Sequence, residues 1–177
     1  TDFAAVMQRV QNKIERIAPH DSVERYSAMG VDCVNGNAEI LTPWLVRVNG
    51  KELRTRAIVL ATGASPVIPD IAGLQEVPYL TSDTIWRLQA LPERLLVRGA
   101  GPIGCELAQA FDRLGSAVTM INKHDQLLPS EDQDVAEQLE SRFVKEGIRF
   151  INNARLEQFS RDGTEHKALI RHEQQQE

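Results

Sequence analysis

The sequence predicts a protein of the α/β class, in which a parallel sheet is preceded by a helix and an antiparallel β-meander. Three observations support this class. From Arg94 onward, short apolar runs alternate with segments of helical periodicity, and each helical segment ends at a glycine. A G-x-G-x-x-G pattern follows the first of those apolar runs. Upstream, Asn49 and Gly50 separate two apolar runs, which is a strong signal for a hairpin.

The composition is that of an ordinary globular chain and argues against two classes of function. The 177 residues are 42% hydrophobic and 25% charged, with a net charge of −5 and no run of five like charges. Binding to nucleic acid through a basic surface is therefore not expected. No apolar run approaches the ~20 residues of a membrane span. The first ten residues lack the basic and apolar regions of a signal peptide, so we expect a cytoplasmic protein.

The first element is expected to be a helix over residues 3–17. Its apolar side chains recur at helical spacing, and Pro19 ends the pattern. We expect the resulting apolar stripe to face a hydrophobic core. The stripe consists of Phe3, Val6, Met7, Val10, Ile14 and Ile17.

The antiparallel meander is expected over residues 31–61. Asn49 and Gly50 both tolerate the positive φ angles of a type I′ turn, and Asn35 and Gly36 form a weaker copy of the same signal. Cys33 falls in the first of these apolar runs, and we expect it to be a core residue of a strand.

Residues 63–74 are expected to form a crossing segment between two domains, because Pro66 and Pro69 prevent regular structure there. A helix-cap signal at Thr81 then predicts a short helix, which Pro92 ends.

The parallel part of the fold is a βαβαβ unit with right-handed crossovers. Strands are expected at 94–97, 117–121 and 148–151, and helices at 103–114 and up to Glu146, followed by Gly115 and Gly147 respectively. Ser130 and Gln133 are expected to form the capping box of the second helix. A final hairpin is expected around Asp162 and Gly163.

The glycine pattern has the context that a dinucleotide-binding loop requires, since a strand precedes it and a helix begins inside it. Gly99 permits the tight turn, Gly101 leaves room for a pyrophosphate, and Gly104 lets the helix approach the strand. The helix N-terminus then favours the anion. We therefore interpret this part of the chain as a Rossmann-type nicotinamide-binding domain.

The residue that contacts the adenosine ribose should follow the second strand, about 20 residues beyond the loop. Asn122 stands there, followed by Lys123 and His124. The acidic residue that would hydrogen-bond the 2′-hydroxyl of NAD is missing, and a cation takes its place. This pattern favours NADP(H) over NAD(H).

Three stretches, in the expected order, resemble the flavin-dependent pyridine nucleotide–disulfide oxidoreductases. They read "AIVLATGASPVIPDIAGL" from Ala57, "YLTSDTIWRLQALPERLLV" from Tyr79 and "GAGPIGCELAQAF" from Gly99. The chain looks most like the mercuric reductase-like and dihydrolipoamide dehydrogenase-like members. Arg98 departs from the small or apolar residue that this family usually has before the first glycine.

The resemblance implies a site of two parts. Ala61, Thr62 and Gly63 would lie near FAD, and Glu106 would approach the nicotinamide end of the dinucleotide. The implied nicotinamide dinucleotide site comprises Gly99, Gly101, Pro102, Ile103, Gly104, Glu106, Asn122, Lys123 and His124.

The resemblance also implies an internal fragment, because the flavin glycine motif, the redox-active cysteine pair and the interface domain of the family are not found in this chain. Residues 1–75 would be part of the FAD-binding domain, and residues 76–177 a truncated NAD(P)-binding domain. In the parent enzyme, a homodimer through the missing domain, hydride would pass from NAD(P)H to FAD and then to a cysteine pair. The fragment is expected to have no catalytic residues or disulfide reductase activity, and it is not expected to retain FAD, because most of the FAD pocket is missing.

Two alternatives stay open at this point. The chain could be a non-catalytic NAD(P)-binding module, or it could come from a flavin reductase without the redox disulfide, of the ferredoxin reductase or NADH oxidase type. Cys105 is expected to be a packing residue, and the four histidines lack metal-ligand spacing.

Overall fold

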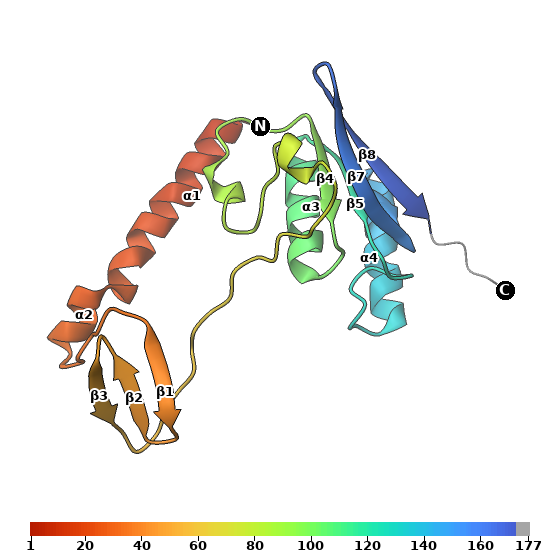
Figure 1. Cartoon of the computed structure of the whole chain (residues 1–177). Coiled ribbons are helices and arrows are strands. Elements are labelled where there is room, and N and C mark those ends of the chain that lie inside the picture. The colour runs from red at the N-terminus through yellow and green to blue at the C-terminus, as the bar shows by residue number, and fades with distance from the viewer. Residues whose placement is uncertain (173–177) are drawn as a thin grey trace. The chain divides into compact units, whose positions relative to one another are not determined.

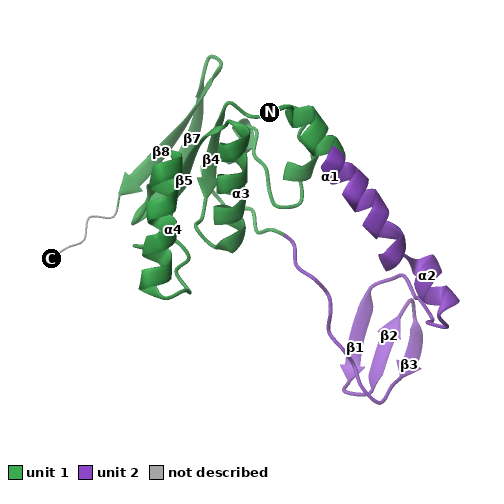
Figure 2. Cartoon of the chain, turned by 180° about the vertical axis from the view of Figure 1, so that it is seen from behind, with its two compact units in different colours: residues 1–8, 66–177 green, residues 9–65 purple. Residues whose placement is uncertain are grey.

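The computed structural model describes residues 1–172, which divide into two compact units. The described part of unit 1 comprises residues 1–8 and 66–172, and unit 2 comprises residues 9–65 (Figure 2). The fold is α/β, with a parallel sheet, an N-terminal helix and an antiparallel meander, as the sequence predicts (Figure 1).

The parallel sheet of unit 1 consists of β4 (Arg94–Arg98), β5 (Ala117–Ile121) and β6 (Arg149–Ile151), in that spatial order. Helix α3 (Pro102–Leu114) connects the first two strands, and α4 (Gln133–Glu146) connects the second to the third. The register places Arg98 beside Ile121, so β4 and β5 end together. This arrangement confirms the expected βαβαβ unit.

Glycines end both crossover helices, as predicted. Gly115 follows α3 with φ of +117°, and Gly147 follows α4 with φ of +95°, in the left-handed region that glycine adopts without strain. The predicted capping box of α4 is wrong. The residue before the helix is Asp132, whose carbonyl oxygen accepts the backbone N–H groups of Val135 and Ala136. Ser130 therefore lies too far upstream to cap this helix.

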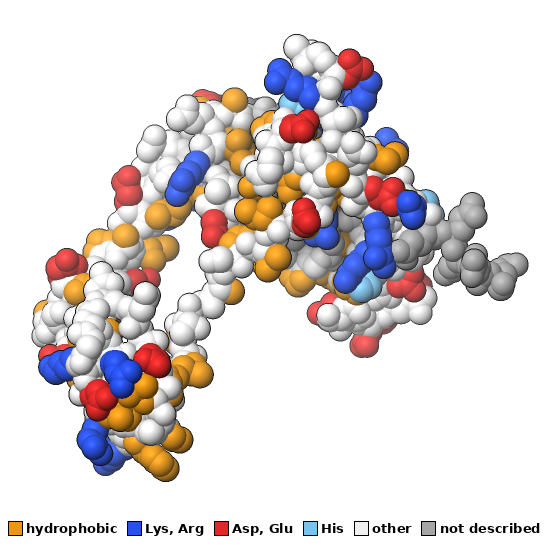
Figure 3. Space-filling model, viewed as in Figure 1, with side chains coloured by type: hydrophobic (Ala, Val, Ile, Leu, Met, Phe, Trp, Pro, Cys, Tyr) orange, Lys and Arg blue, Asp and Glu red, His pale blue; other side chains and the backbone are white. Residues whose placement is uncertain are grey.

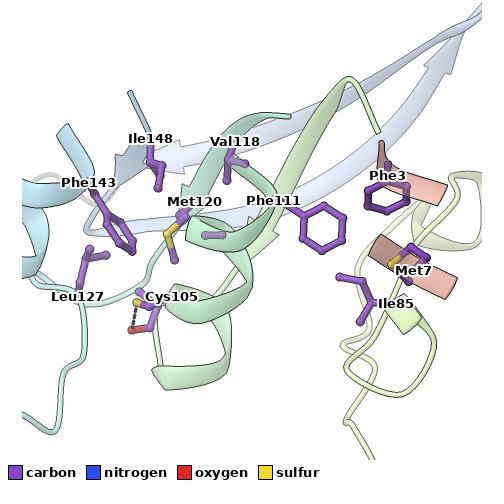
Figure 4. Close-up of a cluster of buried hydrophobic side chains, with 12 residues drawn as sticks. Phe3, Met7, Ile85, Cys105, Phe111, Val118, Met120, Leu127, Phe143 and Ile148 are labelled. Carbon is purple, nitrogen blue, oxygen red and sulfur yellow. Dashed lines mark hydrogen bonds between the residues drawn. The ribbon is translucent and has the colours of Figure 1, made fainter. Parts of the chain in front are cut away.

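The core of unit 1 lies between the sheet and its helices (Figure 4). Met120 of β5 and Phe143 of α4 are fully buried, and burial of such side chains stabilises the fold by about 1.5–3 kcal/mol each. Phe111 of α3 packs against Phe3 of α1, with ring centroids 6.0 Å apart and an interplanar angle of 52°.

Helix α1 (Phe3–Ile17) has the predicted bounds, but its apolar stripe is only partly buried. Phe3 and Met7 lie in the core, whereas Ile14 and Ile17 are 46% and 57% exposed. The expectation that the whole stripe faces a core is therefore wrong for its C-terminal half. Helical spacing predicts that apolar side chains share a face, and burial then depends on what packs against that face.

Two further predicted elements of unit 1 are the C-terminal hairpin and the short helix after Thr81. Strands β7 (Ala154–Asp162) and β8 (Glu165–His172) form the antiparallel hairpin. The backbone N–H of Phe159 in β7 donates to the carbonyl of Ala72 at 2.8 Å, which fastens the preceding loop and the short 3₁₀ helix η2 (Leu74–Glu76) to this hairpin. The short helix predicted after Thr81 is a single 3₁₀ turn, η3 (Ile85–Arg87).

Unit 2 contains the rest of α1, the 3₁₀ turn η1 (Ala18–Asp21), α2 (Val23–Ala28) and an antiparallel sheet. Its strands are β1 (Ala38–Thr42), β2 (Leu45–Val48) and β3 (Lys51–Arg54). The turn between β2 and β3 is the predicted one, with φ of 50° at Asn49 and 76° at Gly50.

The meander is shorter than the sequence suggests. Residues 31–37 form no strand, and the side chain of Asn49 instead donates to the carbonyl of Asn35 at 2.8 Å. Cys33 is exposed in this segment, so its expected place in a strand core is wrong. Residues 57–61 also lack regular structure, and Val59 and Leu60 are 87% and 71% exposed. An apolar run without a neighbouring strand has no partner for the backbone hydrogen bonds of a sheet, so it does not form a strand.

The surface mixes charges of both signs. On the face shown in Figure 3, basic and acidic side chains are interspersed, and apolar side chains reach the surface of unit 2. Within residues 1–172, no helix is both long enough and apolar enough to cross a bilayer.

Helices α3 and α4 are joined by the carboxylate of Glu146. It accepts hydrogen bonds from Gln109 at 2.7 Å, from Arg113 at 2.7 Å and from Arg142 at 2.8 Å. The Arg113 bond, followed by the Gln109 bond, lowers the pKa of Glu146 to about 2 from its ordinary value of 4.5. Because the folded pKa is depressed, the stabilisation is complete above pH 4.5 and is lost as the pH falls toward 2.

We expect Glu146→Gln to flatten the acid dependence of stability. The melting temperature of the unmodified chain should fall more steeply between pH 4.5 and pH 2 than that of the variant, because only the former loses this carboxylate. Circular dichroism melts at four pH values in this window measure both slopes. Glu137→Gln on the exposed side of α4 is the matched control. Equal slopes for the unmodified chain and Glu146→Gln would contradict the assignment.

Candidate functional site

The candidate site lies at the edge of the parallel sheet where β4 and β5 end. The backbone N–H of Gly99, directly after β4, donates to the carbonyl of Ile121 at 2.8 Å, so the two strand ends are joined. The chain then turns through Ala100 and Gly101 into α3. This edge, outside the carboxyl ends of parallel strands, is where open α/β sheets bind ligands.

Each glycine of the motif has a different geometry. Gly99 has φ of +100°, so it makes the tight turn that the sequence assigns to it. A Cβ placed on Gly104 would overlap the carbonyl oxygen of Gly99 and lie 3.2 Å from its carbonyl carbon. Gly104 therefore allows α3 to approach the loop closely, which also agrees with its predicted role.

Gly101 differs from Gly104 because a Cβ placed there would meet no protein atom within 4 Å, and from Gly99 because its φ is not positive. Its backbone is extended, with φ of −73° and ψ of 177°, a conformation that any residue can adopt. The protein's own packing therefore does not require glycine at this position. An open space in front of the helix N-terminus does require it, if a ligand approaches the backbone there.

The N-terminus of α3 offers backbone donors at this point. Pro102 occupies the first turn and has no N–H to satisfy. The N–H groups of Ile103 and Gly104 lack acceptors within the helix, because they belong to its first turn. Together with the helix dipole, they favour a bound anion.

The predicted ribose-contacting residues fall at the end of β5, but they have two different environments. Asn122 is only 2% exposed, and its side chain is hydrogen-bonded within the protein. Lys123 and His124 are exposed. Of the three, only Lys123 and His124 can present their side chains to a ligand, and Asn122 is placed to shape the turn beneath them.

Asn122 begins a loop, residues 122–128, that returns to the glycine motif. The backbone N–H of Leu128 donates to the carbonyl of Ala100 at 2.8 Å. Asn152 and Glu140 also contact this loop, and sequence reasoning assigned no role to either of them. The only local signal was the polar pair that follows the third strand, at positions 152 and 153.

Cys105 is a packing residue, as predicted. Its thiol is buried and lies 3.4 Å from the carbonyl oxygen of Ala100, to which it donates (Figure 4). Desolvation is the main cause that raises the pKa of this thiol to about 11, and the negative charge of Glu106 adds to the effect. A thiolate is therefore not formed here near neutral pH.

Glu106 lies on the exposed side of α3, at a cleft between α3 and α4 of about 330 Å³. The lining is mostly apolar and consists of Pro102, Cys105, Glu106, Gln109, Leu128, Glu131, Leu139 and Phe143. Among residues 1–172, no group of three His, Cys, Asp or Glu side chains is arranged to hold a metal ion.

The residues expected near FAD belong to unit 2, whereas the glycine loop belongs to unit 1. Ala61, Thr62 and Gly63 are exposed and lack regular structure, and Gly63 has φ of +69°. Their contact with a flavin stays a prediction.

Comparison with known proteins relates this geometry to one family. Residues 4–177 match a family model described as pyridine nucleotide-disulphide oxidoreductase. Mercuric reductase from Lysinibacillus sphaericus is 32% identical over 162 residues, which cover 92% of this chain and 30% of that protein. Dihydrolipoyl dehydrogenase from Acholeplasma laidlawii is 33% identical over 147 residues, covering 77% of this chain and 44% of the relative.

Solved structures give the same result. The HOCl-induced flavoprotein disulfide reductase RclA from Escherichia coli is 29% identical, with a TM-score of 0.81 over 97% of this chain and 40% of that one. LpdA from Mycobacterium tuberculosis is 30% identical, with a TM-score of 0.71 over 93% of this chain and 39% of that one. The chain spans about a third of the length of the mercuric reductases that it matches.

Proposed function

Because the chain belongs to the pyridine nucleotide-disulphide oxidoreductase family, we propose that residues 76–177, within unit 1, are its NAD(P)H-binding domain and that the glycine loop holds the pyrophosphate. In a complete enzyme, a dinucleotide held by this loop would supply a hydride for FAD, whose electrons would then reduce a cysteine pair. The 177 residues contain two cysteines, Cys33 and Cys105, and neither belongs to a closely spaced pair. The cysteine pair of this proposal therefore lies outside the sequence in hand.

One observation carries the proposal: the space in front of Gly101 is open while Gly104 is tightly packed. A purely structural turn would explain the glycines at 99 and 104, where φ and close packing require them. It does not explain glycine at 101. A pyrophosphate that approaches this backbone does explain it, and the N–H groups of α3 would then bind the phosphate oxygens.

The charge at the end of β5 favours NADP(H). Lys123 and His124 are exposed beside the glycine loop, and neither the end of β5 nor Asn122 offers a carboxylate for the ribose hydroxyls. A cation attracts a 2′-phosphate, and the missing carboxylate removes the repulsion that NAD-specific sites impose on it. The exposed Asp125 follows on the same loop and is the charge that opposes this preference.

Two further parts of the proposal concern the rest of the enzyme. Glu106 would face the nicotinamide end of the dinucleotide, and residues 61–63 would contact FAD. The free cysteines, one of them exposed, suit a reducing compartment such as the cytoplasm. The proposal also assigns residues 1–75 to the FAD-binding domain and residues 76–177 to the NAD(P)-binding domain. The complete enzyme would be a homodimer formed through another domain.

The first test is calorimetric titration of the chain with NADPH and, separately, with NADH. We expect saturable binding of both, with NADPH tighter by about tenfold, because charge-assisted hydrogen bonds to a phosphate contribute about 1.5–3 kcal/mol. Lys123→Gln should remove most of this difference by weakening NADPH alone.

Lys145→Gln at the exposed end of α4 is the matched control, since it removes the same charge away from the loop. Tighter binding of NADH would keep the domain assignment and overturn the NADP(H) preference. No binding of either dinucleotide at millimolar concentration would overturn the proposed function of unit 1.

A further inference from the structure

Beneath the exposed Lys123 and His124, the loop at residues 122–128 contains a polar side chain that is almost fully buried, that of Asn122. The side-chain amide of Asn122 donates to the carbonyl of Gln126 at 2.6 Å and to Oδ1 of Asn152 at 3.2 Å. Its own Oδ1 accepts the backbone N–H of His124 at 3.2 Å. One buried amide therefore holds the backbone of this loop at two separate positions.

A second layer continues the same arrangement. Nδ2 of Asn152 donates to the carbonyl of Asp125 at 2.9 Å and to Oε1 of Glu140 at 3.2 Å. The same Oε1 accepts the backbone N–H of Leu127 at 2.9 Å. Asn152 follows β6 and Glu140 lies on α4, so the loop is held from two other elements of the fold.

The backbone of the loop is also fastened on its other sides. The N–H of Asn153 donates to the carbonyl of His124, and the N–H of Ala154 donates to the carbonyl of Asn122, both at 2.9 Å. Most of the loop's polar backbone groups thus have fixed partners, whereas the side chains of Lys123 and His124 are exposed. Buried polar side chains that are fully hydrogen-bonded make a segment rigid, and a rigid loop orders fewer groups when a ligand binds.

We propose that Asn122, Asn152 and Glu140 form a positioning network that holds Lys123 and His124 in place for the 2′-phosphate of NADPH, and that this network sets the preference for NADPH over NADH without contacting the cofactor. The inference rests on the proposed function of unit 1. It assigns specificity to residues beneath the binding surface. The network also fixes the backbone at Asp125, the one carboxylate on this loop, relative to Lys123 and His124.

The test compares two substitutions on the same helix. Glu140→Ala removes the carboxylate that holds Leu127 and Asn152, whereas Glu137→Ala removes an exposed carboxylate that is bonded to Gln133 on α4 itself. Dissociation constants for NADPH and NADH are measured by calorimetry for both variants. We expect Glu140→Ala to lower the NADPH-over-NADH affinity ratio about fivefold, with the Kd of NADH changed less than about twofold. Glu137→Ala should change neither constant.

Asn152→Ala gives an independent measurement and a test of coupling. It should lower the ratio to a similar extent, and its combination with Lys123→Gln should lower the ratio no further than Lys123→Gln alone, because both act on the same contact. Circular dichroism melts identify any variant that is unfolded at the titration temperature. Glu140→Gln and Asn152→Ser are then used in its place, because each keeps part of the hydrogen bonding.

The outcomes separate the network from the proposed function. An unchanged ratio in both Glu140→Ala and Asn152→Ala would overturn the positioning role while NADPH binding by the unmodified chain still stands. Equal weakening of NADPH and NADH would also overturn it, since that is the effect of general damage to the fold. If the unmodified chain binds neither dinucleotide, the proposed function itself fails.

Discussion

Gly101→Ala is expected to lower the affinity for NADPH and NADH by a factor of about 100 and to leave the fold intact. The Cβ of alanine would project into the open space where the pyrophosphate approaches the backbone. A phosphate displaced from this position loses at least two charge-assisted hydrogen bonds to backbone N–H groups. At about 1.5 kcal/mol or more for each bond, the loss is about 3 kcal/mol, which corresponds to two orders of magnitude in Kd.

The same substitution should have little effect on stability, because two small contributions oppose each other. Alanine is a poorer residue than glycine before a helix, and Gly101 precedes α3. Alanine also restricts the unfolded chain, and it adopts the observed φ of −73° without strain. The Cβ meets no protein atom within 4 Å, so no packing contact is disturbed.

Calorimetry measures the affinity, and a thermal melt of the same preparation measures the stability. The combination is informative because loss of binding together with an unchanged melt can arise only at the ligand surface. Retained affinity would show that the dinucleotide does not approach this backbone. In that case the open space at Gly101 would lose its explanation, and the proposed function would lose the observation on which it depends.

The parallel part of the fold could be predicted because its signals are local. A glycine follows each crossover helix, and the strand–glycine–helix order specifies both the loop and the direction of the chain. The helix bounds at Leu114 and Glu146 followed directly from Gly115 and Gly147. The predicted cap of α4 is wrong, because Ser130 and Asp132 are both good capping residues and the choice between them depends on where the loop turns.

Burial could not be predicted in the same way. Ile14, Val59 and Leu60 belong to apolar patterns like those of core elements, yet all three are exposed. An apolar pattern states what an element can bury, whereas burial requires a second element at the right distance. Cys33 follows the same rule, since its apolar neighbours indicated a strand that does not form.

The positioning network was missed for a related reason. Asn122 was identified from its place after β5, but as a residue that faces the ribose. Its amide reaches Asn152, which is distant in sequence and belongs to another strand end, and Asn152 in turn reaches Glu140 on α4. Hydrogen bonds of this kind have no spacing rule, so only the folded chain can place their partners together.

The second large effect is expected at Gly104, where the outcome should be the reverse of that at Gly101. Gly104→Ala should destabilise unit 1 by about 1 kcal/mol net, because overpacking in a close-packed site costs about 1–3 kcal/mol and the better helix propensity of alanine offsets part of it. The added Cβ would overlap the carbonyl oxygen of Gly99 and approach Cγ1 of Val97 to 3.7 Å. A backbone carbonyl cannot rotate away as a side chain can, so α3 or the loop must shift.

The helix propensity of alanine exceeds that of glycine by about 1 kcal/mol, which opposes the clash and makes the sign of the effect a real test. If stability rises, the close approach of α3 to the loop is not a constraint on this fold. A melting temperature lower by about 4–8 °C is the expected result.

Because each unit contains one tryptophan, a Trp44→Phe background leaves Trp86 to report on unit 1 alone. Gly101→Ala in that background is the matched control, since it adds the same methyl group to the same loop. A loss of stability at 104 with none at 101, and a loss of affinity at 101, would separate the glycine that the fold requires from the glycine that the ligand requires.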